Sequence, residues 1–395
     1  MAADGERSRC VRLAIYSHKR CWSSAASRTG YATDGGFPFQ MGALSQLFDH
    51  TVVVVPCARV GSSRGETPLE GERLRVAPLA EPAGSGFLRK ALFPFWVLRN
   101  SAVLVREARA CDVIHSIIPG DVGTVGMFLA LLARKKLLVR HCGNWFVQQT
   151  IAEHFWKWFM ERLRGRSRVM LATGGGASRP SERNPGIRWI FSTSLWESEL
   201  LTCGVDRDGE VRASLIIACR QDPEKGTGVV IESLPLLLER SPEATLDVVG
   251  DGAALEEFRR LAAALGLKDR VTFHGHVDRD GVIRLLRRAT LFCYPTRASE
   301  GFPKVVLEAL ACGLPVVTTR VSVLPELIAQ GCGVLAEPTP AAVAEAVAGC
   351  LSDPNRYREM SRCAMIVARR FSLERWRDTI GALLRTHWGE PRAHA

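Results

Sequence analysis

Two carboxylates and two cations are the residues best suited to chemistry in this sequence. Glu300 and Glu308 lie eight residues apart in a mostly small and apolar stretch, and Arg220 and Lys225 lie upstream, five residues apart. Carboxylates accept hydrogen bonds from hydroxyl groups, and two cations can neutralise a diphosphate. Together these groups predict a sugar-nucleotide site. Ordinary solvated charges on an α/β unit are the alternative interpretation.

The elements expected around the two glutamates are a strand, a loop, a short helix and a second strand. An apolar run at 290–294 predicts the first strand, so Glu300 falls in the loop at its carboxyl end, where open α/β sheets bind ligands. Pro303 suits the first helical position, and Gly313 suits the residue just after the helix. At ~100° per residue, Glu308 lies only ~80° around the helix from Glu300. Both carboxylates therefore face one side of a crevice, beside a helix N-terminus that attracts anions.

The cationic pair has a similar setting. Residues 213–218 predict the first strand of a new alternating α/β series, and Arg220 and Lys225 follow at its carboxyl end and at the start of the next helix. A further strand is expected at 246–249, before a turn that begins at Gly250. We therefore place the domain boundary near residues 205–212.

A pair of glycines is a candidate in the first half of the chain. Residues 11–16 predict a buried strand, which a polar loop at 17–34 follows, and Gly35 and Gly36 then precede a helical stretch at 38–48. Adjacent glycines let backbone N–H groups approach a ligand closely, and a simple turn is the alternative.

Two histidines near strand ends are further candidates. His141 ends a strand expected at 136–141, beside glycine and asparagine residues, and is therefore placed to line a crevice. His115, in the strand expected at 112–115, is the weaker candidate. A purely structural role is the alternative for each histidine.

Length and composition describe a soluble globular protein. The 395 residues suffice for two domains, with 47% hydrophobic and 24% charged residues. No apolar run approaches the ~18 residues of a membrane-spanning helix, and the polar N-terminus predicts no signal peptide. The 12 cysteines show no C-x-x-C pair and no metal-ligand spacing. We therefore expect reduced thiols, no metal site and a cytoplasmic location.

The basic charge has several possible partners. A net charge of +11 suits phosphorylated substrates, an anionic membrane surface or nucleic acid, and we expect no nucleic acid because no binding module is recognisable. Residues 87–99 and 155–164 combine aromatic with basic residues. Basic helices with aromatic faces can lie on an anionic bilayer, which would place the protein peripherally at the inner membrane face. Core aromatics with solvated charges are the alternative.

The stretch at 295–317 closely resembles the E-x7-E signature of the retaining group 1 glycosyltransferases (family 4, GT-B fold). That signature runs roughly Pro-Ser-x-x-Glu-Gly-Phe-Gly-x-x-x-x-Glu-Ala-x-Ala-x-Gly-x-Pro-Val-Val. Here one extra residue separates Pro295 from Glu300, and Pro303 replaces a common glycine. Residues 219–226 are similar to the family's Gly-Arg-x-x-x-x-Lys-Gly, with Cys219 in place of the first glycine. The resemblance is clear from about residue 213 to residue 337, and it is weak before residue 213.

The resemblance implies a GT-B architecture, in which two Rossmann-like domains face each other across a cleft. The expected parts are an acceptor-side domain at 1–207, a donor domain at 208–371, and a C-terminal helix at 372–395 that packs back on the first domain. The implied activity is retaining transfer of a sugar from a nucleoside diphosphate sugar to a glycan, lipid-linked or small-molecule acceptor, in polysaccharide or glycoconjugate biosynthesis. Such enzymes usually need no metal, and we expect no cofactor besides the donor substrate. A non-catalytic, sugar-nucleotide-binding partner subunit and a sugar-nucleotide epimerase of similar fold are the alternatives.

The resemblance also implies a role for each candidate residue. Glu300 would hold the donor sugar near its reacting carbon, and Glu308 would bind the ribose hydroxyls. His141 stands in a His-Cys-Gly sequence, where the family typically has His-Gly near the donor sugar. The groups implied around the nucleotide diphosphate are Arg220, Lys225, Gly35, Gly36, Gly250 and the helix start at Gly301, Phe302 and Pro303.

Overall fold

The computed structural model describes residues 10–58, 67–84, 86–148, 150–205, 212–298 and 301–389. These residues form two compact units. The first contains the described chain up to Thr173, Ala177–Ile190 and the described residues from Leu373 onward; the second contains Gly174–Gly176 and Phe191–Ser372. The chain thus enters the second unit at residue 191, whereas the expected boundary was 207. The physical reason is that Leu195, Leu200 and Cys203 are buried in the core of the second unit.

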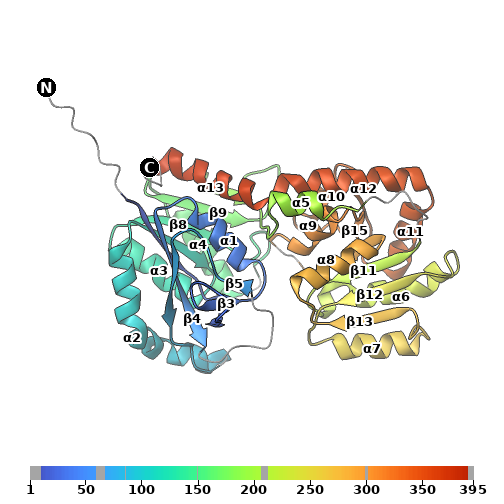
Figure 1. Ribbon diagram of the computed structural model, residues 1–395, viewed down its shortest axis with the longest axis horizontal. Coiled ribbons are helices and arrows are strands. Elements are labelled where there is room, and N and C mark those ends of the chain that lie inside the picture. The colour runs from blue at the N-terminus through green and yellow to red at the C-terminus, as the bar shows by residue number, and fades with distance from the viewer. Residues whose placement is uncertain are drawn as a thin grey trace. The chain divides into compact units, whose positions relative to one another are not determined.

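The first unit is built on a largely parallel sheet (Figure 1). Its parallel strands lie in the order β10-β9-β8-β7-β1-β4-β6, and β2, β3 and β5 continue the sheet from β4. Consecutive residues of β7 are all buried, and because alternate side chains point to opposite faces, both faces of the sheet must be covered. The strands are β1 Arg12–Tyr16, β2 Cys21–Ser23, β3 Tyr31–Thr33, β4 His50–Ala58, β5 Thr67–Pro68, β6 Leu74–Leu79, β7 Val113–Ile118, β8 Lys136–His141, β9 Arg168–Thr173 and β10 Ile187–Ile190.

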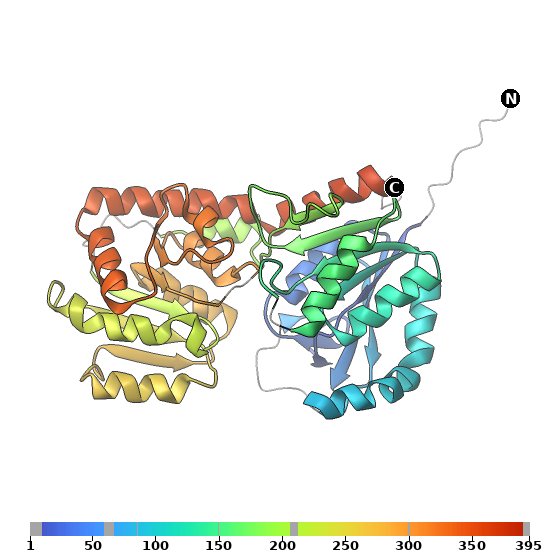
Figure 2. The ribbon, with the colours of Figure 1, turned by 180° about the vertical axis from the view of Figure 1, so that it is seen from behind.

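Helices cover both faces of this sheet (Figure 2). Trp96, Met127 and Trp156, from three different helices, pack in one hydrophobic cluster with the strand residues Ala14 and Val52. The final helix packs within the same unit, where the Trp388 Nε1 donates to the Arg166 oxygen at 3.1 Å. The expected C-terminal helix is therefore confirmed. The helices are α1 Phe37–Ser45, α2 Gly86–Ala110, α3 Asp121–Leu132, α4 Ile151–Arg162 and α13 Leu373–Trp388.

The segment at 17–34, expected as a polar loop, contains two short strands. Cys21–Ser23 and Tyr31–Thr33 pair in antiparallel fashion, with Trp22 opposite Ala32. Strands of three residues are too short for a period-two pattern to emerge from the sequence, which is why the prediction of a loop was wrong here.

The second unit is a six-stranded parallel sheet in the order β13-β12-β11-β14-β15-β16. All four residues of β14 are buried, so helices cover this sheet on both faces as well. Its strands are β11 Ser214–Ala218, β12 Thr245–Val249, β13 Val271–Gly275, β14 Leu291–Tyr294, β15 Val316–Thr318 and β16 Gly333–Leu335. Its helices are α5 Glu197–Thr202, η1 Pro223–Lys225, α6 Thr227–Leu238, α7 Leu255–Ala264, α8 Arg279–Arg288, α9 Lys304–Ala311, α10 Leu324–Ile328, α11 Pro340–Leu351, α12 Pro354–Ala368 and η2 Arg369–Phe371. No helix in the described ranges of either unit combines the length and the apolarity that a membrane crossing demands.

Candidate active site

The sheet of the second unit reverses its strand order between β11 and β14. The chain proceeds outward from β11 through β12 and β13 on one side, and through β14, β15 and β16 on the other. Because these strands are parallel, their carboxyl ends lie along one edge. In open α/β sheets, ligands bind at this edge where the order reverses. The loops that follow β11 and β14 both begin there, so the sheet brings the cationic motif at 219–226 to the same edge as residues 295–298 and the start of α9.

One carbonyl joins these two loops. The Glu224 oxygen accepts hydrogen bonds from two backbone N–H groups and one hydroxyl of the facing loop, at 2.8 Å from Arg297, 3.3 Å from Ala298 and 3.2 Å from Thr296. Gly226 has a φ of 91°, and a Cβ there would lie 2.5 Å from the Pro295 oxygen. The turn that carries Lys225 is therefore fixed directly against the loop that precedes α9.

A buried amide fixes the loop after β11. The Gln221 Nε2 donates to the Cys219 oxygen at 3.0 Å and to the Val249 oxygen at 2.9 Å. The Thr227 hydroxyl donates to the Gln221 Oε1 at 2.7 Å. Gly250 has a φ of 118°, and a Cβ there would lie 1.9 Å from the Cys219 oxygen. Glycine at position 250 thus allows the end of β12 to pass beside the loop that carries the cations.

The two cations of the loop differ in exposure. The Arg220 side chain is 74% exposed, and its Nε donates to Asp222 Oδ2 at 2.5 Å. Lys225 ends the short helix η1 and is half-buried. Burial lowers the pKa of Lys225, and the Arg220 charge lowers it further, while the Asp222 and Glu224 carboxylates oppose the shift. Two cations in one short loop can share the oxygens of a diphosphate.

The helix α9 begins at the same edge of the sheet. Pro303 is its N-cap residue, one position before the first helical position expected, and no side-chain cap forms within the described chain. Gly301, Phe302 and Pro303 are buried, and the Phe302 ring lies 5.6 Å from that of Phe371. An N-terminus without a side-chain cap is suited to an anion. Glu300 lies outside the described residues, so its predicted contact with a donor sugar stays a prediction.

Glu308 is half-buried on α9 and engages two polar groups. The Ser194 hydroxyl donates to Glu308 Oε1 at 3.1 Å. Burial alone would lower the pKa of Arg279, but its hydrogen bond to Glu199 and the charges of Glu199 and Glu308 raise it. The Arg279 Nη1 lies 2.7 Å from Glu199 Oε1, and its Nη2 donates to the Ser194 oxygen at 3.1 Å. The sequence interpretation missed both Ser194 and Arg279, because neither belongs to a motif and only the fold places them beside Glu308.

In the first unit, Gly35 and Gly36 precede α1 as expected. Gly35 has a φ of 69°, in the left-handed region that favours glycine, and a Cβ there would meet no atom within 4 Å. Gly36 is the N-cap of α1, without a side-chain cap. The requirement at position 35 is therefore conformational, not steric. Binding of a diphosphate by this pair stays a prediction.

His141 is fully buried at the carboxyl end of β8. Neither ring nitrogen has a partner of normal hydrogen-bond geometry within the described residues, and the Trp145 ring packs edge-on at 5.2 Å. Burial lowers the pKa of His141 to about 4, although the Gly143 backbone and the Glu153 carboxylate partly oppose the shift. The ring is therefore neutral near pH 7, and its predicted contact with the donor sugar stays a prediction.

His115 lies in the middle of β7, because that strand runs on to Ile118, beyond the end that the sequence suggested. Its Nδ1 lies 3.0 Å from the Leu138 oxygen, and burial lowers its pKa to about 3. The structural interpretation therefore fits His115 better. His18, which follows β1, was not singled out from the sequence; its ring packs against Gly120, where a Cβ would lie 2.1 Å from Nδ1.

Residues 210–365 match the family model described as glycosyl transferases group 1. These residues therefore form a group 1 glycosyl transferase domain. A GDP-mannose-dependent alpha-(1-6)-phosphatidylinositol monomannoside mannosyltransferase of Mycolicibacterium smegmatis is 33% identical over 182 residues, which are 44% of this chain and 47% of the relative. A D-inositol 3-phosphate glycosyltransferase 2 of Catenulispora acidiphila is 32% identical over 228 residues, 55% of this chain and 52% of the relative. The chain thus matches about half the length of these curated relatives.

Solved structures resemble nearly the whole chain. Anabaena Alr3699/HepE, crystallised with UDP and glucose, superposes with a TM-score of 0.69 and 18% identity, over 96% of this chain and 100% of its own. A glycosyltransferase from Rickettsia africae superposes with a TM-score of 0.71 and 14% identity, over 96% of this chain and 98% of its own. At these identities the likeness concerns the fold alone. The group 1 glycosyl transferase domain is thus the second half of a GT-B fold, as the resemblance implied.

Proposed function

We propose that this protein is a retaining glycosyltransferase that takes a sugar from a nucleoside diphosphate sugar. The observation that carries the proposal is the edge of the second sheet where β11 and β14 meet. Arg220, Lys225 and the N-terminus of α9 lie at this edge, although their segments are far apart in the sequence. The Glu224 carbonyl bonds the loop that carries the two cations to residues 296–298 of the facing loop. A diphosphate matches these cations and N–H groups, and the Glu308 carboxylate is suited to ribose hydroxyls.

In the proposed reaction, the bond between the sugar C1 and the diphosphate oxygen breaks, and the acceptor hydroxyl oxygen bonds to C1 on the same face. The hydroxyl proton passes to an oxygen of the leaving diphosphate. Arg220 and Lys225 stabilise the negative charge that develops on that diphosphate, which is electrostatic catalysis. His141 and Glu300 are assigned to the donor sugar, and Gly35 and Gly36 to the diphosphate and the acceptor, by the family resemblance. Metal independence is part of the proposal.

For the donor and acceptor, the proposal follows the curated relatives. The mannosyltransferases among them are named for GDP-mannose and for phosphatidylinositol mannosides. We therefore place GDP-mannose first among the donors and a lipid-linked sugar or polyol first among the acceptors. A cytoplasmic position at the inner face of a membrane suits such an acceptor.

The surface of the first unit supports the lipid-linked acceptor. On α4, Trp156 and Met160 are buried, but Phe155 is 43% and Trp158 47% exposed. Their rings stack at 5.9 Å, and the Arg162 guanidinium lies 4.4 Å from the Trp158 ring centre. The interpretation of these aromatics as core residues is thus wrong for Phe155 and Trp158. Exposed aromatics beside cations are suited to the boundary of an anionic bilayer.

The decisive experiment is a calorimetric titration with GDP, UDP, ADP and CDP, on the parent protein and on Lys225→Ala and Arg220→Ala. We expect one nucleotide to bind, and each variant to weaken it by at least about tenfold, as for a lost charge-assisted contact. Arg240→Ala is the matched control, because Arg240 is an exposed arginine of the same unit outside the candidate site. Transfer from the matching donor sugar is then measured. Unchanged binding in the site variants would refute the site, and binding without turnover would identify a sugar-nucleotide-binding subunit instead.

A further inference from the structure

A cavity of about 410 Å³ lies in the first unit, away from every residue assigned above. It is lined by the amino-terminal ends of β1, β4 and β6 and by the last turn of α2, at residues 12–13, 50–52, 73–75, 107 and 110–111. The strands of this sheet run parallel, so the cavity is at the sheet edge opposite the one where His141 ends β8. Its volume falls within the range of ligand pockets, roughly 300–1,000 Å³.

The strand register sets a row of cationic side chains along this cavity. Arg12 of β1 pairs with His50 of β4, and Arg73 is the turn residue directly before β6, whose first residue Leu74 pairs with Thr51. All three side chains, Arg12, His50 and Arg73, belong to the lining of the cavity. Val52 and Arg75, which are register partners, belong to it as well. The α2 residues Ala110 and Cys111 complete the lining. Apolar groups thus form the interior, and arginines lie along its rim.

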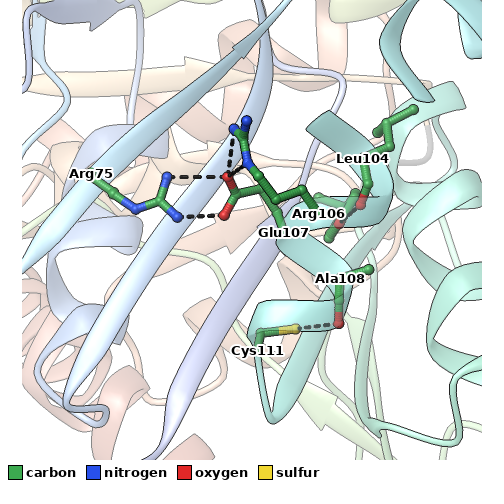
Figure 3. Close-up of polar contacts among 7 residues, drawn as sticks. Arg75, Leu104, Arg106, Glu107, Ala108 and Cys111 are labelled. Carbon is green, nitrogen blue, oxygen red and sulfur yellow. Dashed lines mark hydrogen bonds and ion pairs between the residues drawn. The ribbon is translucent and has the colours of Figure 1, made fainter. Parts of the chain in front are cut away.

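The buried carboxylate of this region is already neutralised. Glu107 is 2% exposed and forms ion pairs with Arg75 and Arg106, whose guanidinium groups converge on it from β6 and from α2 itself (Figure 3). Burial alone would raise the pKa of Glu107, but the hydrogen bonds and charges of the two arginines lower it below its ordinary value. The carbonyls at the end of α2 are also engaged, since the Lys135 Nζ donates to the Cys111 oxygen at 2.6 Å.

The side chains of Arg12 and Arg73 differ from that of Arg75, which is paired with Glu107. Within the described ranges, neither side chain forms an ion pair or a hydrogen bond, and both residues are exposed. Leaving His50 aside, the lining has three guanidinium groups and one carboxylate, which is a net charge of +2. A phosphate monoester carries a charge of about −1.5 to −2 near pH 7, whereas a carboxylate carries only one negative charge. Guanidinium groups also match phosphate oxygens in geometry.

We propose that this cavity is a second, non-catalytic binding site for a phosphate monoester with a small apolar body. The phosphate lies between the Arg12 and Arg73 guanidinium groups, and the body contacts Val52, Ala110 and Cys111. The ligand is a free phosphorylated metabolite or the headgroup of a lipid that ends in a phosphate monoester; both present the same chemistry. This site does not depend on the proposed transferase activity, because none of its residues belongs to the donor site.

The test is a calorimetric titration of the full chain with phenyl phosphate, inorganic phosphate and benzoate, near neutral pH. The protein carries Lys225→Ala, so that the donor site does not compete for the probe. We expect phenyl phosphate to bind more tightly than inorganic phosphate, which lacks the apolar body, and than benzoate, which lacks the second charge. The double variant Arg12→Gln with Arg73→Gln should weaken this binding at least about tenfold, as for lost charge-assisted hydrogen bonds. Vesicles with and without phosphatidic acid form the lipid arm of the experiment.

The controls separate a built site from general attraction to a basic protein. Arg99→Gln removes an exposed arginine of α2 outside the cavity and should leave the affinity unchanged. The double variant Arg12→Lys with Arg73→Lys keeps the charge but loses the guanidinium geometry, and should bind with intermediate affinity. Because the Arg12 and Arg73 side chains form no ion pair or hydrogen bond within the described residues, melting temperatures should match the parent. The proposal is overturned if no probe binds, if benzoate binds as well as phenyl phosphate, or if Arg99→Gln weakens binding as much as the double variant.

Discussion

Lys225 occupies a position where burial acts against its own charge. Lys225 is half-buried, and burial is the main reason that its pKa is lowered, with the charge of Arg220 lowering it further. Such a lysine loses its proton at a lower pH than an ordinary lysine, whose pKa is ~10.4. In its charged form, the residue is suited to bind a diphosphate.

The shift in Lys225 predicts how nucleotide affinity depends on pH. Since only the charged form attracts the diphosphate, affinity should fall as the pH rises toward the lowered pKa of Lys225. Lys225→Arg should remove this fall, because a guanidinium stays charged throughout the range. Calorimetry at several alkaline pH values on both proteins measures the effect. Parallel pH profiles for the two proteins would show that Lys225 does not contact the nucleotide.

The buried histidines predict an acid-sensitive fold. Burial lowers the pKa of His141 to about 4 and of His115 to about 3, against 6.5 for an unfolded histidine. Between the folded and unfolded pKa values, the unfolded chain binds more protons than the folded chain. The stability that the two neutral, buried histidines contribute is therefore complete above pH 6.5 and is lost as the pH falls. The full slope is ~1.36 kcal/mol per pH unit, but the unfolded histidine is only half protonated at pH 6.5, so each histidine should reduce the unfolding free energy by about 1.6 kcal/mol between pH 6.5 and pH 5. Urea titrations at both pH values measure this loss for the parent and for His115→Gln and His141→Gln. Each variant should lose less unfolding free energy between pH 6.5 and pH 5 than the parent, by the amount given above. An equal loss in parent and variant would contradict a neutral, buried histidine.

Among the elements, the turn after β12 has the tightest steric requirement of the candidate site. Gly250 combines a φ of 118° with a predicted contact of 1.9 Å between any Cβ and the Cys219 oxygen. The atom that it would meet is backbone, which cannot rotate away as a side chain could. The close packing of the end of β12 against the loop after β11 therefore requires a glycine at this position.

Gly250→Ala should consequently destabilise the second unit and displace the loop of Arg220. Backbone strain and the steric clash together should cost about 2–4 kcal/mol in unfolding free energy, with loss of nucleotide binding. Gly349→Ala is the matched control, since Gly349 lies within α11 and a Cβ there meets nothing within 4 Å. That change should stabilise by about 0.5–1 kcal/mol, because alanine is the better helix former. Denaturant unfolding monitored by circular dichroism compares the two, and equal effects from both glycines would disprove the steric argument.

The whole molecule combines a net charge of +11 with exposed aromatics on the first unit. Neither feature alone specifies a partner, since many basic proteins bind no membrane. Together they favour an anionic bilayer, where charge attracts the protein over a distance and aromatic rings enter the headgroup region.

Sedimentation with anionic vesicles tests this prediction. The protein should bind vesicles that contain an anionic phospholipid, bind neutral vesicles poorly, and dissociate as salt screens the charges. Phe155→Ser with Trp158→Ser should weaken binding by at least about tenfold, given ~1.5–3 kcal/mol for each large apolar side chain removed from water. Leu236→Ser is the control, because Leu236 is a similarly exposed apolar residue of the second unit. Equal binding to neutral vesicles, or equal loss with the control, would rule out an electrostatically assisted aromatic contact.

The sequence by itself determined the local elements of the donor domain. Strand, turn and helix signals around Pro303, Gly313 and Gly250 depend on near neighbours only, and the structure places those elements within a residue or so of the predicted positions. The resemblance to a family pattern added the GT-B fold, which neither composition nor periodicity could supply.

Only the tertiary structure decided which side chains meet. Arg279 lies beside Ser194 and Glu308 because α8, which begins at Arg279, packs against α9, and no local pattern encodes a contact across 85 residues. The same holds for the cavity at Arg12 and Arg73, whose residues become adjacent through strand register. Exposure of Phe155 and Trp158 was also decided by packing, since a helix with aromatics on several faces can bury only those that face the sheet. In each case the outcome depends on contacts between segments far apart in the sequence, which is why the sequence alone did not predict it.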